Sequence, residues 1–437
     1  MSNALLIIFC AAWMVLGTAP VWGQVKGLIV GPGAERFTIA VSPLKQVGGD
    51  KDDQGISERM AGVIARDLDL SGWFRVLDRS AYIEQAQNSG IKLGSFDFRD
   101  WSTIGAEALI KGGFKVRSGE LTVELRLFDV FQRKQIVGKK YTTEAKNFRR
   151  IAHKFVDELV FQFTGVQGPF DSRIAYVSTA GGQFKEIYVS HLDGSERHQV
   201  SNNRTINLFP SWAPDDRSIL YTSYKRGHAG VYQFDISSGK EKTISIRKGL
   251  NLGGEWSSGG DYVALALERG GNLDLYLLDP AGKVVRRLTK SPGIDISPAW
   301  SPEGDRLVFV SNRSGSPQLY ILNISDGSTR RLTYSGGYNT SPDWSPKGDK
   351  IAYTGMSGGR FNIFSISAEG GDSQMLTSGS GDNEDPSWSP DGRFILFTSN
   401  RRGRYHLHLM RENGENQMRL TASQGDDTNP SWSSRLK

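Results

Sequence analysis

Short runs of β-branched and aromatic residues, separated by turn residues, fill the C-terminal part of this chain. Arg306–Ser311 and Gln318–Asn323 are typical, with Asn312–Ser316 as the polar loop between them. Runs of about five such residues, bounded by Gly, Pro, Asn and Asp, predict short β-strands. The pattern returns in successive units, and each unit predicts four strands.

A tryptophan marks each unit at a constant spacing. Six of them stand 44 residues apart, each before small or turn-forming residues: Trp212, Trp256, Trp300, Trp344, Trp388 and Trp432. A period of roughly 40–45 residues with four strands per unit is typical of a β-propeller. We predict an all-β six-bladed β-propeller whose tryptophans pack between blades.

The first and last units are incomplete in a complementary way. Arg173–Ser178 matches the second strand of a blade but has no tryptophan motif before it, and only Ser434–Lys437 follow the last motif. We therefore expect the C-terminal strand to supply the inner strand of the first blade. This closes the ring over residues 173–437 and removes two open sheet edges.

Residues 37–163 have a different pattern, which predicts a separate α+β N-terminal domain. Helical periodicity covers Ser57–Leu70, with Ser57 as N-cap and Gly72 as stop signal, and further helices are expected at Arg79–Gln87 and Asn147–Phe163. The expected strands are Phe37–Val41, Trp73–Leu77, Ala108–Val116, Leu121–Val130 and Lys134–Thr142. This order predicts one sheet with its helices on one face. Residues 164–172 are the expected linker.

The start of the chain is typical of an exported protein. Residues 1–23 combine the short apolar run Ala4–Leu16 with small residues before Gln24, which predicts a signal peptide, although no Lys or Arg precedes the run. Residues 24–36 are apolar and glycine-rich. They are expected to be either a disordered start or an exposed peptide that adds to a partner's sheet edge.

Composition limits the classes of function. Cys10 is the only cysteine of the 437 residues and lies in the expected signal peptide, so the mature chain offers neither a disulfide nor a thiol nucleophile. The net charge of +6 is spread along the chain without a basic block, which argues against nucleic-acid binding. We expect an exported, monomeric protein without a cofactor.

Motifs that carry chemistry are scarce. The chain has no nucleophile elbow, phosphate-binding loop or paired-histidine zinc motif. His406 and His408 are two residues apart in one strand, so they share a face and can reach a common metal ion. No third ligand stands at a useful spacing, so a polar strand face is the simpler interpretation.

One polar position recurs in every unit. Five residues before each tryptophan stands an Asn or Asp: Asn207, Asn251, Asp295, Asn339, Asn383 and Asp427. These residues either cap turns between blades or form a polar collar for a ligand or cation at one mouth of the central channel. Strand direction assigns them to the mouth opposite the tryptophan turns, where the loops between second and third strands carry many arginines, such as Arg360 and Arg402.

The export signal, the small α+β domain and repeats such as Pro386–Arg393 together resemble the TolB family of the bacterial Tol–Pal envelope system. The resemblance implies a non-enzymatic periplasmic scaffold that serves outer-membrane integrity and cell division. It implies that the channel mouth binds the lipoprotein Pal, that an N-terminal segment binds TolA, and that some bacteriocins exploit the same mouth.

Carried onto this chain, the resemblance selects two sets of contact residues. For TolA these are Gln24, Val25, Lys26, Leu28, Ile29 and Val30; for Pal they are Leu250, Gly253 and Ile296 together with the six Asn and Asp residues. Two other classes stay open at this stage. A hydrolase or lyase needs converging titratable residues in the channel, and a sugar- or cation-binding propeller needs converging oxygen atoms.

Overall fold

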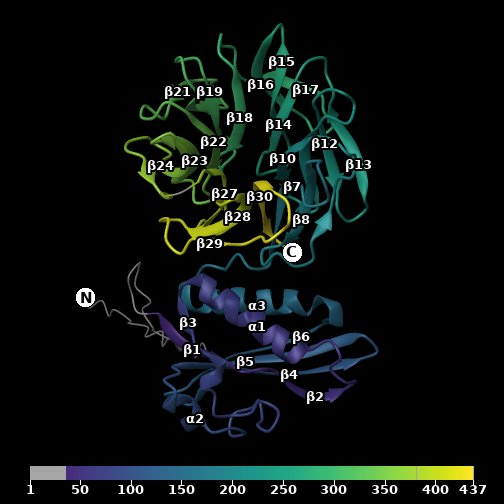
Figure 1. Ribbon diagram of the computed structural model, residues 1–437, viewed down its shortest axis with the longest axis vertical. Coiled ribbons are helices and arrows are strands. Elements are labelled where there is room, and N and C mark those ends of the chain that lie inside the picture. The colour runs from purple at the N-terminus through teal and green to yellow at the C-terminus, as the bar shows by residue number, and fades with distance from the viewer. Residues whose placement is uncertain (1–35, 380, 437) are drawn as a thin grey trace, which may run out of the picture. The chain divides into compact units, whose positions relative to one another are not determined.

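The computed structural model describes residues 36–379 and 381–436 (Figure 1). The expected signal peptide, residues 1–23, lies outside the described residues. Residues 24–35 of the expected N-terminal segment also lie outside them.

The N-terminal part of the described chain forms one mixed sheet with the strand order β3-β1-β4-β5-β6, and β2 pairs with the far half of β4. The strands are β1 (Phe37–Val41), β2 (Lys45–Gly49), β3 (Phe74–Val76), β4 (Ala108–Arg117), β5 (Glu120–Asp129) and β6 (Lys134–Glu144). The helices are α1 (Ile56–Ser71), α2 (Phe98–Thr103) and α3 (Phe148–Thr164), with short 3₁₀ turns at η1 (Arg79–Ala81) and η2 (Ala145–Asn147).

Helices cover both faces of this sheet, so the expectation of helices on one face is wrong. α1 and α3 lie side by side on the face that carries Ile39 and Ile110. α2 lies against the opposite face, where Trp101 packs with Leu109 (Figure 1). α2 is too short to reveal a helical period in the sequence, and β2 is likewise an element that the pattern did not predict.

Two local predictions fail because tertiary contacts decide the backbone. The helix expected at Arg79–Gln87 is only the turn η1, since Tyr82 accepts a hydrogen bond from Val41 N at 2.9 Å and its ring meets Trp101 at 5.0 Å. Ser57 does not cap α1 with its side chain. Its hydroxyl donates to Leu44 O, while Asp52 accepts from the first amides of the helix.

Six four-stranded sheets form the propeller, and in each the strand that carries the tryptophan comes first. Blade one is β30 (Asp427–Arg435), β7 (Ser172–Ser178), β8 (Glu186–His191) and β9 (His198–Gln199); blade two is β10 (Asn207–Trp212), β11 (Ser218–Ser223), β12 (Gly230–Asp235) and β13 (Lys240–Ser245); blade three is β14 (Asn251–Trp256), β15 (Val263–Arg269), β16 (Asn272–Leu278) and β17 (Val284–Arg287). Blade four is β18 (Asp295–Trp300), β19 (Arg306–Ser311), β20 (Gln318–Asn323) and β21 (Thr329–Arg331); blade five is β22 (Asn339–Trp344), β23 (Lys350–Ser357), β24 (Arg360–Ser367) and β25 (Gln374–Met375); blade six is β26 (Asn383–Trp388), β27 (Phe394–Arg402), β28 (Arg404–Arg411) and β29 (Met418–Arg419).

The C-terminal strand closes the ring, which confirms the prediction. β30 pairs antiparallel with β7, so that the two ends of the propeller share one sheet. The indole nitrogen of Trp432 also donates to Ser172 Oγ at 2.7 Å. The first strands of all six blades contact one another around the axis.

The six tryptophans fill the spaces between blades, as predicted. Each is 5–8% exposed. Trp300 packs on Ala264 and Leu275 of blade three, and its indole nitrogen donates to Glu255 O at 3.1 Å. Trp388 repeats the arrangement on blade five, with Asp343 O as acceptor at 3.2 Å.

Blade one also carries the polar contacts with the helices. Asp193, in the loop between β8 and β9, accepts from Arg149 Nε of α3 at 3.0 Å, and its carbonyl accepts from Arg66 of α1 at 3.1 Å. His153 of α3 bridges Asp67 of α1 and Asp193, at 2.6 and 3.7 Å. This buried charge cluster fixes α1 and α3 against the propeller.

Ring closure predicts that Trp432 is as important for stability as a tryptophan inside the ring. We expect Trp432→Ala and Trp300→Ala to lower the free energy of unfolding by similar amounts, about 3–5 kcal/mol each, in chemical denaturation. Tyr262→Ala, at an exposed turn, is the control and should change little. A loss for Trp432→Ala far below that of Trp300→Ala would contradict closure by the C-terminal strand.

Candidate functional site at the channel mouth

The inner strands of all six blades line one cavity of about 210 Å³. The lining residues lie in the middle of these strands. We call the side on which the inner strands begin, and which also carries the loops between second and third strands, the free face. Gly253 and Ile296, two of the residues expected to contact Pal, line the cavity, and the contact with Pal stays a prediction. Leu250 lies one residue before β14 and is only half-buried, outside the lining.

The six Asn and Asp residues do not form an open collar. They are 0–2% exposed, behind the cavity wall: Asn207, Asn251, Asp295, Asn339, Asn383 and Asp427. Of the two alternatives that the sequence left open, the polar collar is therefore wrong. Their side chains lie between blades. This position agrees better with the other alternative, in which they fix the turns between blades.

Their partners form a second series with the same 44-residue spacing, at the start of the third strand of the preceding blade. Asn207 donates to Glu186 Oε2 at 2.9 Å, Asn339 to Gln318 Oε1 at 2.9 Å and Asn383 to Asn362 Oδ1 at 3.3 Å. The spacing of these partners was visible in the sequence, but the alternation of strand faces gave no reason to pair them with the Asn and Asp series.

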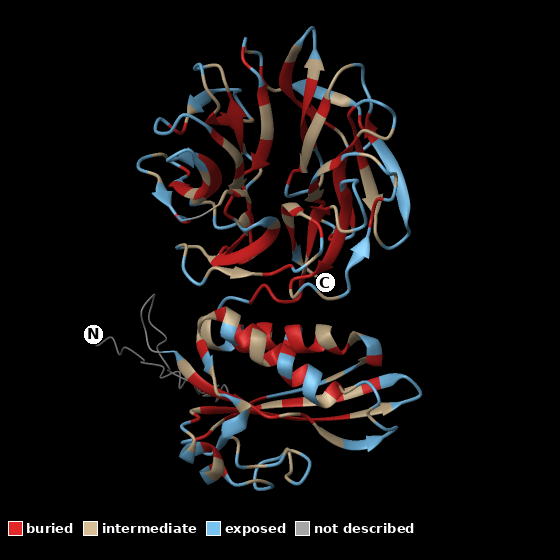
Figure 2. Ribbon diagram, in the orientation of Figure 1, coloured by how far each residue is buried: buried red, intermediate tan, exposed pale blue. Residues whose placement is uncertain are grey.

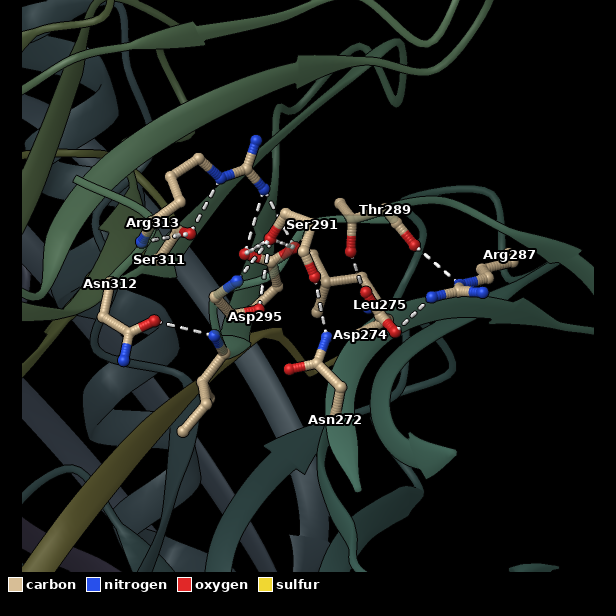
Figure 3. A network of polar contacts seen from close by, with 12 residues as sticks. Asn272, Asp274, Leu275, Arg287, Thr289, Ser291, Asp295, Ser311, Asn312 and Arg313 are labelled. Atoms are coloured by element: carbon tan, nitrogen blue, oxygen red, sulfur yellow. Dashed lines mark hydrogen bonds and ion pairs between the residues drawn. The ribbon is translucent and has the colours of Figure 1, made fainter. Parts of the chain in front are cut away.

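The junction between blades three and four has the charged version of this arrangement (Figure 3). Asp274 and Asp295 occupy the two positions and are both fully buried. Arg313 Nη2 pairs with Asp295 at 2.9 Å, and Arg287 Nη2 pairs with Asp274 at 2.6 Å (Figure 3). Each arginine compensates a carboxylate that would otherwise be buried without a partner.

The cavity wall itself is a ring of left-handed residues. In every inner strand, the residue two places after the Asn or Asp has φ between 47° and 62°, and the pairing register shifts beside it: Phe209, Gly253, Ser297, Ser341, Asp385 and Asn429. Such a bulge normally selects glycine, and an ordinary side chain there costs about 1–2 kcal/mol. Strain of this kind concentrates at functional sites, where a side chain has to be re-aimed.

Part of the ring is linked by hydrogen bonds from blade to blade. Asp385 accepts from Ser341 Oγ at 2.8 Å and from Asn429 Nδ2 at 2.7 Å. Burial raises the pKa of Asp385, and these two bonds offset only part of the increase. Beside it, burial and the nearby carboxylates of Asp385 and Asp382 raise the pKa of Glu384 to about 7.

Two more carboxylates lie deeper in the channel. Glu255 and Asp343 accept from the backbone amides of Trp300 and Trp388, at 3.0 and 2.6 Å. Burial raises the pKa of Asp343 to about 7. Burial, and then repulsion by Asp343, raise the pKa of Glu255 well above its usual value. Both carboxyl groups therefore hold their protons to a higher pH than exposed carboxyl groups do.

The two strand histidines are explained by the polar network. His406 stands in the third-strand series and its Nε2 lies 2.8 Å from Arg419 Nη2, while His408 Nδ1 contacts the carbonyl of His406 at 3.1 Å. Burial lowers the pKa of both residues, to about 4 for His408. Within residues 36–379 and 381–436, no three His, Cys, Asp or Glu side chains gather in a way that fits a metal ion.

Exposed apolar side chains concentrate on the free face. Eight of the large hydrophobic residues that are at least 37% exposed lie in its loops or at the mouth: Phe184, Ile206, Phe209, Ile246, Ile294, Tyr334, Tyr338 and Met356. The strands below them are largely buried, as Figure 2 shows. Exposed cations stand in the same loops, among them Arg226, Arg269 and Arg360. An apolar surface rimmed by charge is typical of a protein-binding site.

Comparison with known proteins adds a family to this geometry. The model of the TolB β-propeller domain matches residues 160–436, and that of the TolB amino-terminal domain matches residues 28–136. The chain belongs to the TolB family.

Individual TolB relatives agree with this. The chain is 40% identical over 204 residues to the Tol-Pal system protein TolB of Desulfosudis oleivorans, covering 47% of this chain and 46% of the relative. It is 40% identical over 246 residues to that of Syntrophus aciditrophicus, covering 55% and 54%. The chain thus spans about half the length of these curated relatives in the matched regions.

A TolB structure matches over a longer span. The crystal structure of TolB from Acinetobacter baumannii shares 27% sequence identity with a TM-score of 0.79, and the match covers 92% of this chain and 97% of that one. Within the described residues, no helix combines the length and the apolar character needed to cross a membrane.

The raised pKa values in the channel predict how stability depends on pH. A carboxyl whose folded-state pKa lies above its unfolded value loses stabilisation as the pH rises from about 4 to about 7. The double variant Glu255→Gln/Asp343→Asn removes this loss. Its side-chain amide oxygens can still accept from the backbone N–H groups of Trp300 and Trp388. We expect thermal unfolding to show a double variant more stable than wild type at about pH 8, on the order of 1–3 kcal/mol, and equal to it near pH 4. Glu303→Gln, an exposed control, should follow wild type at both values.

Proposed function

We propose that this chain is a periplasmic, non-enzymatic scaffold of the Tol–Pal system. It binds the peptidoglycan-associated lipoprotein Pal at the channel mouth on the free face and TolA through residues 24–36. In this way it serves outer-membrane integrity and constriction during cell division, and the same mouth is the one that bacteriocins exploit.

The observation that carries the proposal is the mouth itself. A cavity of about 210 Å³ is surrounded by exposed apolar side chains and cations, and strained residues re-aim its wall. A protein loop that enters the cavity would bury apolar area there, while the rim would select acidic neighbours. The membership of the TolB family supports the choice of Pal as the partner.

The channel carboxylates favour a scaffold over a hydrolase or lyase. Glu255 and Asp343 are engaged with the backbone amides of the next blade along the repeat, and Asp385 is held by Ser341 and Asn429. Groups held in this way contribute to the packing of the ring, and a general base needs an oxygen atom that is free to reach a substrate.

The test is a titration of the mature chain with the soluble domain of the same organism's Pal. Phe209 lines the mouth, is 43% exposed and has φ 53°, a conformation that Asn tolerates better than Phe. Phe209→Asn therefore removes apolar contact area without damaging the fold, and we expect it to weaken binding at least tenfold. Phe131→Asn, on an N-terminal-domain hairpin and 69% exposed, is the matched control and should bind as wild type does.

The other outcomes are informative. Tight binding by Phe209→Asn would keep Pal as partner and move its site away from the mouth. The absence of any Pal binding by wild type would overturn the proposal and return attention to a cation, sugar or enzymatic ligand of the channel.

TolA in place of Pal tests the second site, because deletion of residues 24–30 should abolish TolA binding and preserve Pal binding.

A further inference from the structure

Blade five presents a group of exposed aromatic residues on the free face. Tyr334 and Tyr338 lie in the loop before β22, and Met356 and Phe361 lie on the hairpin of β23 and β24. Tyr334 is 74% exposed, Tyr338 and Met356 are 39% exposed, and Phe361 is partly buried. We call these four residues the blade-five ridge.

The repeat does not require this ridge. At the four matching positions, 44 residues away on each side, blade four has Lys290, Ile294, Asn312 and Pro317, and blade six has Ser378, Asp382, Asn400 and Tyr405. Both neighbouring blades fold into the same four-stranded sheet with those mixed side chains. Four large apolar residues at this place therefore serve something other than the fold of a blade.

The ridge is rigid at its centre. Met356 N donates to Tyr338 O at 2.9 Å, and the rings of Tyr338 and Phe361 meet edge to face with centroids 5.7 Å apart. A two-residue turn, Gly358–Gly359 with φ 59° and 76°, closes the hairpin tightly. Phe361 N also donates to Asp382 Oδ1 at 3.0 Å, so blade six braces the same hairpin.

The buried polar network fixes the loop that carries the tyrosines. Asn339 Nδ2 donates to Ser335 O at 2.9 Å as well as to Gln318 Oε1. Gln318 Nε2 donates in turn to Gly336 O at 3.0 Å. Aromatic side chains on a backbone held in this way lose little conformational entropy when they bind a partner, which is the property of an interface hot spot.

Cations flank the ridge. The guanidinium of Arg331 lies 4.8 Å from the centre of the Tyr334 ring, and its Nε donates to Thr333 O at 2.6 Å. Arg360 is exposed at the start of β24, directly before Phe361. Positive charge beside apolar surface fits a partner that presents a hydrophobic side chain with a carboxylate next to it.

We infer that the blade-five ridge is the apolar anchor of the mouth interface. It receives an exposed aliphatic or aromatic side chain of the folded Pal domain, whose neighbouring acidic groups meet Arg331 and Arg360. This inference rests on the proposed function, since it names the part of the free face that supplies most of the affinity for that partner.

A matched pair of double variants tests it in the same Pal titration. Tyr338→Ala/Met356→Ser removes the centre of the ridge. Tyr262→Ala/Met375→Ser removes the same two residue types at 40% and 47% exposure, on a turn between β14 and β15 and on the outer strand β25. We expect the ridge variant to weaken Pal binding at least thirtyfold and the control to stay within twofold of wild type.

A charge reversal adds a second readout. Arg360→Glu should weaken binding by slowing association, and the effect should shrink as the salt concentration rises. Equal thermal unfolding of all variants shows that the fold is retained.

Each outcome separates the two proposals. Binding by the ridge variant within twofold of wild type, with Phe209→Asn still impaired, would overturn the ridge and leave the mouth as the Pal site. Wild-type protein that binds no Pal would overturn both. Equal losses for the ridge and control variants would also overturn the ridge, because they would report a general loss of surface hydrophobicity.

Discussion

One tryptophan between each pair of blades holds the propeller together. Its ring fills the space between two sheets, and in blades two, four and six its N–H donates to a backbone oxygen of the preceding blade. Because the ring of blades is closed by β30 without a covalent bond, the packing of Trp432 against blade six has to form at the same time as the pairing of β30 with β7. The folding of the propeller is therefore coupled to its C-terminal strand.

A layer of buried polar contacts builds the mouth on this frame. In three of the blades, Asn207, Asn339 and Asn383 donate to the third strand of the preceding blade. Asn251 and Asn339 also donate to backbone oxygens of the loops on the free face. Only the residues just beyond this series reach the cavity, through left-handed bulges. The side chains offered to a partner can therefore differ from blade to blade, while the network beneath them supports the loops. Blade five, with its aromatic ridge, is the strongest example of this freedom.

The 44-residue spacing was sufficient to predict the number of blades, the place of the tryptophans and the closing strand. It left open whether the Asn and Asp side chains fix turns or line the mouth, because the bulge that decides between the two is not visible in the spacing. In a regular strand, residues five apart, such as Asn383 and Trp388, point to opposite faces. The extra residue at Asp385 reverses the alternation, and both side chains lie between blades. A strained φ angle at a non-glycine residue has no signal in a single sequence.

In the N-terminal domain, tertiary contacts override the helical preference of one segment, and a single sequence does not show those contacts either. Residues 79–87 have the composition of a helix, but Glu84 pairs with Lys111, a lysine that is only 2% exposed in β4. Leaving the buried ammonium group of Lys111 without a carboxylate would cost more free energy than the segment would gain from helical hydrogen bonds. The clear periodicity of α1 and α3, whose apolar faces meet the sheet, made those helices predictable.

Hydrogen–deuterium exchange of the mature chain, with and without the soluble Pal domain, tests the central claim most directly. The account predicts protection in the loops that lead into the inner strands, above all residues 334–341 and the hairpin 355–361, together with the cavity wall at 207–210 and 252–254. The tryptophan turns at the other end of the same strands should exchange as before. Protection confined to those turns, or no protection at saturating Pal, would contradict the assignment of the free face as the binding surface.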